Sequence, residues 1–298
     1  MKKIPVILQT DIGTDFDDHW ALYMLLCQDI WDLKMILTDT GDVRYRAAVA
    51  AKLLTCCGRT DVEIALGPGD DKDWDYTLRD CVTEDDLKNY SGRVSENGVA
   101  RLIETVMSSR EPVHLISIGP CTGIARALEL ETHIAEKCCF TGMFGSIAYA
   151  HAAQPGAIAE YNVVCDIPAA QRVFSAPWKQ AKLTPLDSCG QIRIRGENFQ
   201  KLFRSDRPGL KLLMEQYDRW HRYIFSRPMP DHSSVLFDTA AVHLAQSTDF
   251  FRMRQMNLIV DDAGFTKEDP SGKPFDTAVW WEDLAGFEDH ITQVFLGG

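Results

Sequence analysis

Short apolar runs alternate with longer amphipathic segments through the first half of the chain. The pattern predicts strands over residues 4–8, 33–38, 62–66, 113–118 and near Phe140, and helices over 19–27, 45–57, 97–109 and from an N-cap at Thr122. Strands that alternate with helices form right-handed βαβ units, and these build a parallel sheet covered on both faces. We therefore expect an α/β fold with an open, mostly parallel, Rossmann-like sheet, whose ligands bind at the carboxyl ends of the strands.

The second half is less regular. It predicts helices over 196–225, 238–246 and 287–296 and a strand over 253–260. No internal repeat, low-complexity tract or Ser/Gly/Pro-rich linker marks a domain boundary. We expect residues 1–298 to form a single domain with an elaborated C-terminal half.

Composition narrows the possible partners. The chain has 298 residues, 45% of them hydrophobic, and a formal net charge of −12. This acidity argues against nucleic acid and anionic membranes as partners, and no window approaches the roughly 20 apolar residues of a membrane span. Nine cysteines without a C-x-x-C pair predict reduced thiols and a cytoplasmic protein. The most acidic stretch, residues 61–89, is predicted to be a solvated surface loop.

A cluster of aspartates follows the first predicted strand. Four carboxylates occur within eight residues, at Asp11, Asp15, Asp17 and Asp18. Carboxylates held close together repel one another unless protons or a cation neutralise them, and the simplest cation is Ca²⁺ or Mg²⁺ with oxygen ligands. A helix cap accounts for one Asp but not for four. The spacing of an EF-hand and the glycine pattern of a phosphate loop are both absent.

These residues carry a resemblance to a known family. Residues 10–22, TDIGTDFDDHWAL, resemble the N-terminal signature of the inosine-uridine-preferring nucleoside hydrolases, with a lengthened loop before the Asp pair. Further segments resemble family motifs in the same order: 40–42 (Gly-Asn), 118–125 (G-P-L-T-N-[IL]-A), 159–162 (A-E-F-N), 166–170 (D-P-x-A-A) and 237–242 (H-D-P-x-A-V). The resemblance implies the nucleoside hydrolase fold, a homodimer or homotetramer, and hydrolysis of the N-glycosidic bond of a ribonucleoside or related N-riboside.

The resemblance also implies roles for individual residues. Ca²⁺ would be held by Asp11, Asp18, the backbone carbonyl of Thr122 and Asp238. Asp11 would act as general base on a metal-bound water that attacks the anomeric carbon. The residues at substrate-binding positions are Asp17, Asp42, Gln154, Glu160 and Asn162.

The chain departs from the family pattern at four positions. Asp42, Gly123 and Gln154 each replace an asparagine, and Phe237 replaces the histidine that assists the departing base. Because Phe237 cannot transfer a proton, leaving-group activation must come from another residue or be unnecessary. The candidates, none of which the sequence favours enough to assign, are His19, His151, Tyr217, Trp220, His221, Tyr223 and His232.

Two other functions fit the same aspartate cluster. A metal-dependent phosphoesterase also places aspartates after a first strand, although it usually adds histidine ligands and phosphate-binding Arg or Lys. A non-catalytic riboside-binding homologue is compatible with the changes at Asp42 and Phe237. A screen of ribosides against phosphate esters separates these functions, because it reads free base, sugar and phosphate.

Overall fold

The computed structural model describes residues 2–72 and 74–297, and their strands form one sheet in the order β4-β3-β2-β1-β5-β6-β7-β10-β8-β9. The strands are β1 (Ile4–Thr10), β2 (Trp31–Thr38), β3 (Glu63–Leu66), β4 (Val94–Ser95), β5 (Val113–Ser117), β6 (Cys138–Gly142), β7 (Gln180–Leu183), β8 (Phe251–Val260), β9 (Thr266–Glu268) and β10 (Lys273–Trp281). Neighbouring strands from β4 to β10 are parallel, whereas β8 pairs antiparallel with β10 and β9. The mostly parallel α/β sheet expected from the sequence is confirmed.

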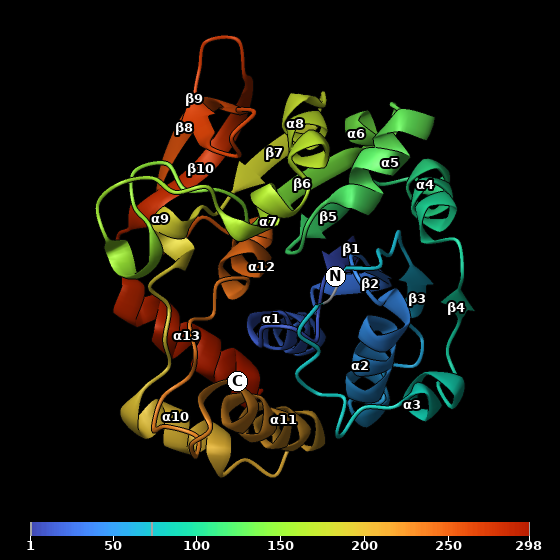
Figure 1. The fold of residues 1–298 in the computed structure, drawn as a ribbon, viewed down its shortest axis with the longest axis vertical. Helices are drawn as coiled ribbons and strands as arrows, with labels where there is room; N and C mark the ends of the chain where they lie inside the picture. The colour runs from blue at the N-terminus through green and yellow to red at the C-terminus, as the bar shows by residue number, and fades with distance from the viewer. Residues whose placement is uncertain (1, 73, 298) are drawn as a thin grey trace.

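Helices cover both faces of the sheet (Figure 1). One face is covered by α1, α2 and α12, with α11 and α13 packed outside them, and the other face is covered by α4, α5 and α8. The helices are α1 (Asp17–Leu26), α2 (Val43–Cys56), α3 (Glu84–Lys88), α4 (Gly98–Ser108), α5 (Thr122–Leu130), α6 (Ile134–Lys137), η1 (His151–Ala153), α7 (Tyr161–Cys165), α8 (Ile167–Ser175), α9 (Leu186–Cys189), α10 (Gly196–Phe203), α11 (Pro208–Phe225), α12 (Thr239–Gln246) and α13 (Leu284–Leu296).

The chain changes direction across the sheet at β1. From β1 it moves outward through β2, β3 and β4, and it then returns to add β5 on the other side of β1. Thr10 pairs with Thr38 of β2, and Gln9 pairs with Ser117 of β5, so these three strands end at the same level. Such a switch point opens a crevice outside the carboxyl ends of the strands. The aspartate cluster begins there, directly after β1.

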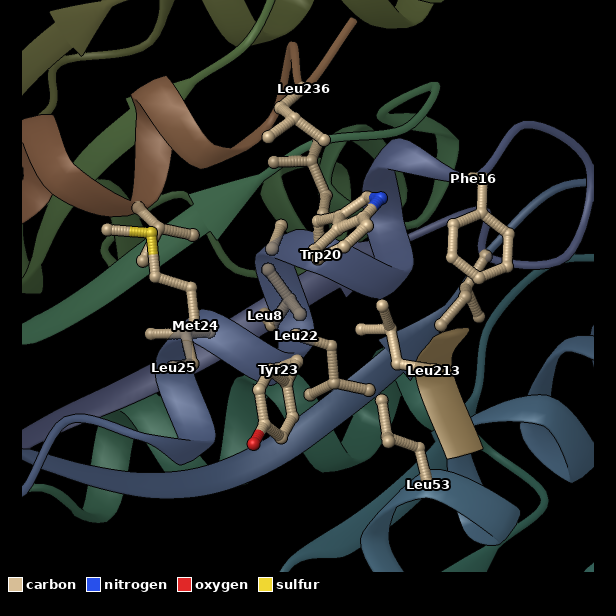
Figure 2. Packing of buried hydrophobic residues seen from close by; sticks show 14 of the residues in the cluster. Leu8, Phe16, Trp20, Leu22, Tyr23, Met24, Leu25, Leu53, Leu213 and Leu236 are labelled. Carbon is tan, nitrogen blue, oxygen red and sulfur yellow. The ribbon is translucent and has the colours of Figure 1, made fainter. Parts of the chain in front are cut away.

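Helix α1 is buried almost entirely, because α11, α12 and α13 pack around it. Figure 2 shows its side chains among Leu53 of α2, Leu213 of α11 and Leu236. Trp20 and Leu22 have no exposed surface. Dense packing of this kind resists displacement, so the start of α1 gives the adjoining aspartates a rigid base.

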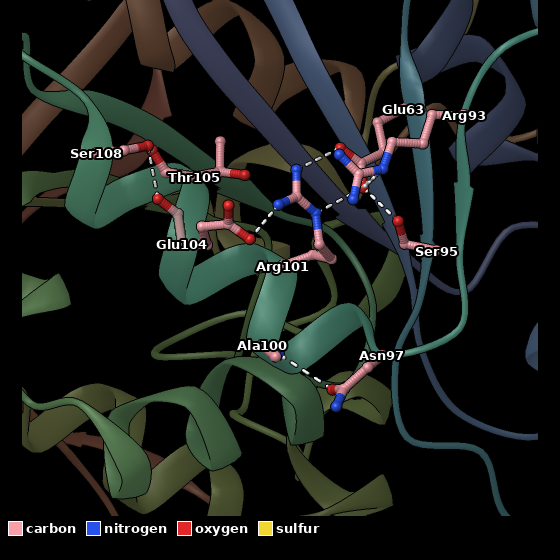
Figure 3. A network of polar contacts seen from close by, with 9 residues as sticks. All are labelled: Glu63, Arg93, Ser95, Asn97, Ala100, Arg101, Glu104, Thr105 and Ser108. Carbon is pink, nitrogen blue, oxygen red and sulfur yellow. Dashed lines mark hydrogen bonds and ion pairs between the residues drawn. The ribbon is translucent and has the colours of Figure 1, made fainter.

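A polar network fixes the edge of the sheet (Figure 3). The guanidinium of Arg101 on α4 donates two hydrogen bonds to Glu63 of β3, at 2.8 and 2.9 Å. The hydroxyl of Ser95 on β4 donates to the same carboxylate at 2.6 Å. These contacts hold the two-residue strand β4 in place, remote from the crevice.

Two local predictions are wrong. Residues 196–225 form two helices, since Pro208 lacks the N–H that a continuous helix would need and instead begins α11. Thr122 is the first residue of α5 and not its N-cap, and its hydroxyl donates to Asp166 at 2.7 Å. Within the described residues, none of the helices has both the length and the apolar character needed to cross a bilayer.

Candidate active site

A cavity of about 680 Å³ opens at the carboxyl ends of the central strands. Its floor is acidic, and its walls carry aromatic rings from α11 and from the segment that precedes α12. Six of the residues singled out from the sequence as site residues line it: Asp11, Asp17, Asp18, Glu160, Asn162 and Asp238. The structure thus brings together, in one concave site, side chains more than 200 positions apart.

Three carboxylates form a group that could hold a metal ion. Ligand oxygens of Asp17, Asp18 and Asp238 all lie within 4.8 Å of one another, and the three residues are no more than 8% exposed. Asp17 and Asp18 open helix α1, and Asp238 directly precedes α12. Because α1 and α12 pack against each other, residues distant in sequence converge here.

Burial raises the pKa of each of these carboxyls well above its usual value, and their mutual repulsion adds to the effect. Asp17 and Asp238 are close enough to share a proton, while Asp18 accepts a hydrogen bond from the Thr10 hydroxyl. A divalent cation would replace the shared proton and let all three carboxyls ionise.

Asp11 lies beside this group. It is buried and lines the cavity, and burial raises the pKa of its carboxyl, which Arg46 partly opposes. The backbone that carries Asp11 is fixed by Arg46, a completely buried side chain of α2 that sequence reasoning missed. Its guanidinium donates to the carbonyls of Asp11, Ile12 and Thr40 and to the Thr14 hydroxyl.

A further buried carboxylate, Asp39, follows β2 directly. It accepts hydrogen bonds from the backbone N–H of Gly123 at 2.6 Å and of Thr40 at 3.0 Å. A Cβ atom at Gly123 would lie only 2.7 Å from an Asp39 oxygen. In this chain Gly123 leaves free the space that the Asp39 carboxylate occupies. The feature of the sequence that could have singled out Asp39 is its position directly after the strand predicted over residues 33–38.

We expect Gly123→Ala to destabilise the protein by about 1–3 kcal/mol, because its Cβ would displace the Asp39 carboxylate. Asp39→Ala is expected to cost a similar amount, since it leaves the buried N–H of Gly123 without an acceptor. In the double variant the steric conflict is gone, so its loss should be smaller than the sum of the two single losses. Urea unfolding of the four proteins measures this coupling, and strictly additive losses would contradict the proposed contact.

Glu160 and Asn162 also line the cavity, and hydrogen bonds hold both residues in place. Glu160 caps α7 and accepts from the backbone N–H groups of Gly145 and Asn162, at 3.0 and 2.8 Å. Burial raises its pKa to about 7, although these hydrogen bonds favour the charged form. The Asn162 amide donates to the carbonyls of Ile118 and Met143, both at 3.1 Å, and so ties this wall to the ends of β5 and β6.

Three predicted site residues lie outside the cavity lining: Thr122, Asp42 and Gln154. Asp42 caps α2 by accepting from Tyr45 N at 3.0 Å and pairs with Arg79 at 3.2 Å. Thr40 and Gly41 both have positive φ, and this turn directs the chain away from the strand ends before Asp42. Gln154 is exposed in the turn after η1.

The acidic stretch 61–89 is only partly the solvated loop expected from the sequence. Asp75 and Thr77 line the cavity, and the Thr77 hydroxyl donates to the Thr14 carbonyl at 3.1 Å. Tyr223 near the end of α11 donates to Asp75 at 2.6 Å, and Arg219 pairs with Asp80 at 2.9 Å. The middle of the stretch therefore forms part of the cavity rim.

The cavity lining also narrows the choice of leaving-group candidates. Tyr217, Trp220, His221, His232 and His151 line the cavity together with Phe237. His19 is not among the lining residues: it is completely buried, stacked on Phe16, and burial lowers its pKa to about 3. Tyr223 lies on the rim, and its hydroxyl already donates a hydrogen bond to Asp75.

Comparison with known proteins agrees with this geometry. The family model described as inosine-uridine preferring nucleoside hydrolase matches residues 6–279. The pyrimidine-specific ribonucleoside hydrolase RihA of Photobacterium profundum is 24% identical over 233 residues, which cover 72% of this chain and 70% of that protein. RihA of Escherichia coli O7:K1 is 25% identical over 238 residues, which cover 74% of this chain and 72% of that protein.

Solved structures share the fold. The inosine-uridine preferring nucleoside hydrolase of Bacillus anthracis superposes with a TM-score of 0.76 at 21% identity, over the full length of both chains. A purine-preferring ribonucleoside hydrolase from Gardnerella vaginalis gives a TM-score of 0.75 at 20% identity, over 98% of each chain. The chain belongs to the inosine-uridine preferring nucleoside hydrolase family and is a hydrolase that acts on ribonucleosides.

Proposed function

We propose that this protein is a calcium-dependent nucleoside hydrolase in which Asp11 activates the attacking water. The observation that carries the proposal is the buried group of Asp17, Asp18 and Asp238 beside Asp11, at the switch point of the sheet. Carboxylate oxygens are the ligands that Ca²⁺ prefers, and the group contributes no nitrogen or sulfur donor that would favour a transition metal.

The proposed ligand set differs in part from the one expected by resemblance. Asp18 and Asp238 are retained, Asp17 joins them as a ligand, and Asp11 completes the site from its position beside them. We keep the Thr122 carbonyl as a proposed further ligand from the family pattern. Bound Ca²⁺ would supply Lewis acidity to a water and ligand positions for two sugar hydroxyls.

The chain's own residues carry the other roles. Asp11 takes the proton of the attacking water, because its raised pKa makes it a stronger base than an exposed aspartate. Glu160 and Asn162 bind the sugar from the cavity lining, where their own hydrogen bonds hold them in place. The carboxylates around the floor stabilise positive charge as the ribosyl group becomes oxocarbenium-like.

We also propose a cytoplasmic homodimer or homotetramer. All nine cysteines lie in the described part of the chain and are unpaired, which fits a reducing compartment. The assembly is the one the family resemblance implies.

The proposal is tested by the release of free base and ribose from purine and pyrimidine ribonucleosides. We expect turnover with Ca²⁺, its loss in a chelator and its recovery when Ca²⁺ is restored. Phosphate esters serve as the comparison substrates. Phosphate release without base release would overturn the proposal, and so would full nucleoside turnover in the chelator.

The raised pKa values predict how the stability of the metal-free protein depends on pH. A carboxyl whose pKa is raised on folding stabilises the protein below its unfolded pKa, and this stabilisation is lost as pH rises through the folded value. For Glu160, with a folded pKa of about 7, the loss amounts to about 3 kcal/mol. In a chelator we therefore expect a lower Tm at pH 8 than at pH 5.

Calcium should reduce this difference, because it stabilises the ionised forms of Asp17, Asp18 and Asp238 at high pH. Thermal unfolding followed by circular dichroism, with chelator and with Ca²⁺, measures both effects. A metal-free Tm that rises from pH 5 to pH 8 would contradict the assignment of buried, repelling carboxyls.

A further inference from the structure

We propose that His151 is the catalytic acid that protonates the departing base, in the role left open by Phe237. The inference rests on the proposed function and deepens it. His151 lines the same cavity as the carboxylate group, and its ring centroid lies 5.7 Å from that of Phe237, with the two rings nearly perpendicular at 83°. The imidazole thus lies beside the position where the family motif has its histidine.

The turn that carries His151 is fixed at both ends. The backbone N–H of Ala150 donates to the carbonyl of Gln154, and that of Gly156 donates to the carbonyl of Ala148, both at 2.8 Å. On the α9 side, the Asp187 carboxylate accepts from the backbone N–H groups of residues 147 and 148, at 2.8 Å each. A side chain on so well-anchored a turn can be held in a productive position.

The backbone of the turn is also strained. Ala152 and Ala153, which follow His151, have φ of 54° and 58°. Left-handed conformations are unfavourable for a non-glycine residue and occur where the surrounding structure enforces them, often at functional sites. The anchoring hydrogen bonds supply that enforcement here.

Charge distinguishes His151 from the other histidines of the cavity. The charged groups on the elements packed around it are acidic: Asp15 in the loop after β1 and Asp187 on α9. His221 instead lies near Arg227 and His232, and burial together with these positive groups lowers its pKa.

Hydrogen bonding separates the histidines further. Nδ1 of His221 and of His232 each contacts a backbone carbonyl, of Arg227 at 3.2 Å and of Ser233 at 2.8 Å. One ring nitrogen of each is therefore committed to the wall of the cavity. Within the described residues, the His151 ring makes no such contact.

The proposed step balances as follows. Water adds to the anomeric carbon and gives its proton to Asp11, while the C–N bond breaks and its electron pair goes to the base nitrogen. That nitrogen takes a proton from the His151 imidazolium. Solvent then returns a proton to His151 and removes one from Asp11, so the net reaction is riboside plus water to ribose plus free base.

Leaving-group dependence tests the assignment. Inosine and uridine need a protonated leaving base, whereas 4-nitrophenyl β-ribofuranoside releases a stable phenolate that needs no proton. We expect His151→Gln in the Ca²⁺-loaded enzyme to lower kcat for both nucleosides by about 10²–10⁴-fold and kcat for the nitrophenyl riboside by less than about threefold. His133→Gln, at a histidine whose side chain is 67% exposed outside the cavity, is the matched control and should leave both activities unchanged.

Each alternative outcome overturns the assignment in a recognisable way. Equal losses on the two kinds of substrate would make His151 a structural residue, and no loss would exclude it from the reaction. A nucleoside-only loss in His221→Gln or His232→Gln, with none in His151→Gln, would transfer the role to that residue. A wild-type enzyme inactive on all these ribosides would instead overturn the proposed function, and the acid assignment with it.

Discussion

Replacing Asp11 by asparagine is expected to lower kcat for ribonucleoside hydrolysis by about 10²–10⁴-fold while the protein stays folded. Asparagine keeps the shape of the side chain. Shape matters here because Gly119 packs closely against Asp11: a Cβ at Gly119 would lie only 2.6 Å from an Asp11 oxygen. What the substitution removes is the ability to accept a proton from water. Steady-state kinetics with saturating Ca²⁺ measures the loss.

The matched control is Asp29→Asn, which alters a fully exposed aspartate and should leave kcat unchanged. Calcium affinity, measured by titration calorimetry, separates two roles of Asp11. A large loss of kcat with nearly normal affinity is the signature of a base, whereas a parallel loss of affinity adds a ligand role. An Asp11→Asn enzyme that binds Ca²⁺ and retains wild-type kcat would exclude Asp11 as the base.

Hydrophobic periodicity predicted most of the fold because strands and helices here have distinct apolar periods. The first strand, predicted over residues 4–8, is β1 (Ile4–Thr10), and the helix predicted over 45–57 is α2 (Val43–Cys56). The periodicity failed between α10 and α11, where both helices keep an apolar face toward the same core. A break between two helices that share a core leaves the apolar pattern intact, so only Pro208 marks it.

The candidate site was predictable where its residues follow one another along the chain, and not where the backbone reverses. Asp11, Asp17 and Asp18 lie in one short segment whose charge density shows without a structure. After β2 the sequence pattern favoured Asp42, but the left-handed residues Thr40 and Gly41 separate Asp42 from the strand end, and neither Asp42 nor Asp39 lines the cavity. Positive φ at a threonine has no clear signature in a single sequence.

Arg46 was missed because a single sequence does not show which helix positions are buried in the fold. It lies on α2 among alanines and valines, where an arginine is usually assigned to the solvent-facing side. In the structure it is completely buried and joins the turn after β1 to the turn after β2. Its charge also lowers the pKa of Asp11, Asp18 and Asp39 against the raising effect of burial.

Arg46→Met is therefore expected to destabilise the protein by about 3–5 kcal/mol, a large part of the stability of a typical domain. The variant keeps the apolar stem, but it leaves the carbonyls of Ile12 and Thr40 without their donor and the buried carboxylates without their counter-charge. Urea unfolding measures the loss. Arg44→Met is the matched control on the same helix, because the Arg44–Glu96 pair is exposed and contributes at most about 1 kcal/mol.

Arg46→Lys separates charge from geometry. Lysine restores the positive charge but has no planar fork to reach several carbonyls at once, so it should recover part of the stability and little of the kcat. That split follows because the charge offsets the repulsion among the carboxylates, whereas the fork fixes the backbone that aims Asp11. Losses of stability of similar size in Arg46→Met and Arg44→Met would show that the buried guanidinium stabilises neither the carboxylates nor the backbone that carries Asp11. Full kcat in Arg46→Lys would assign the effect of Arg46 to its charge alone.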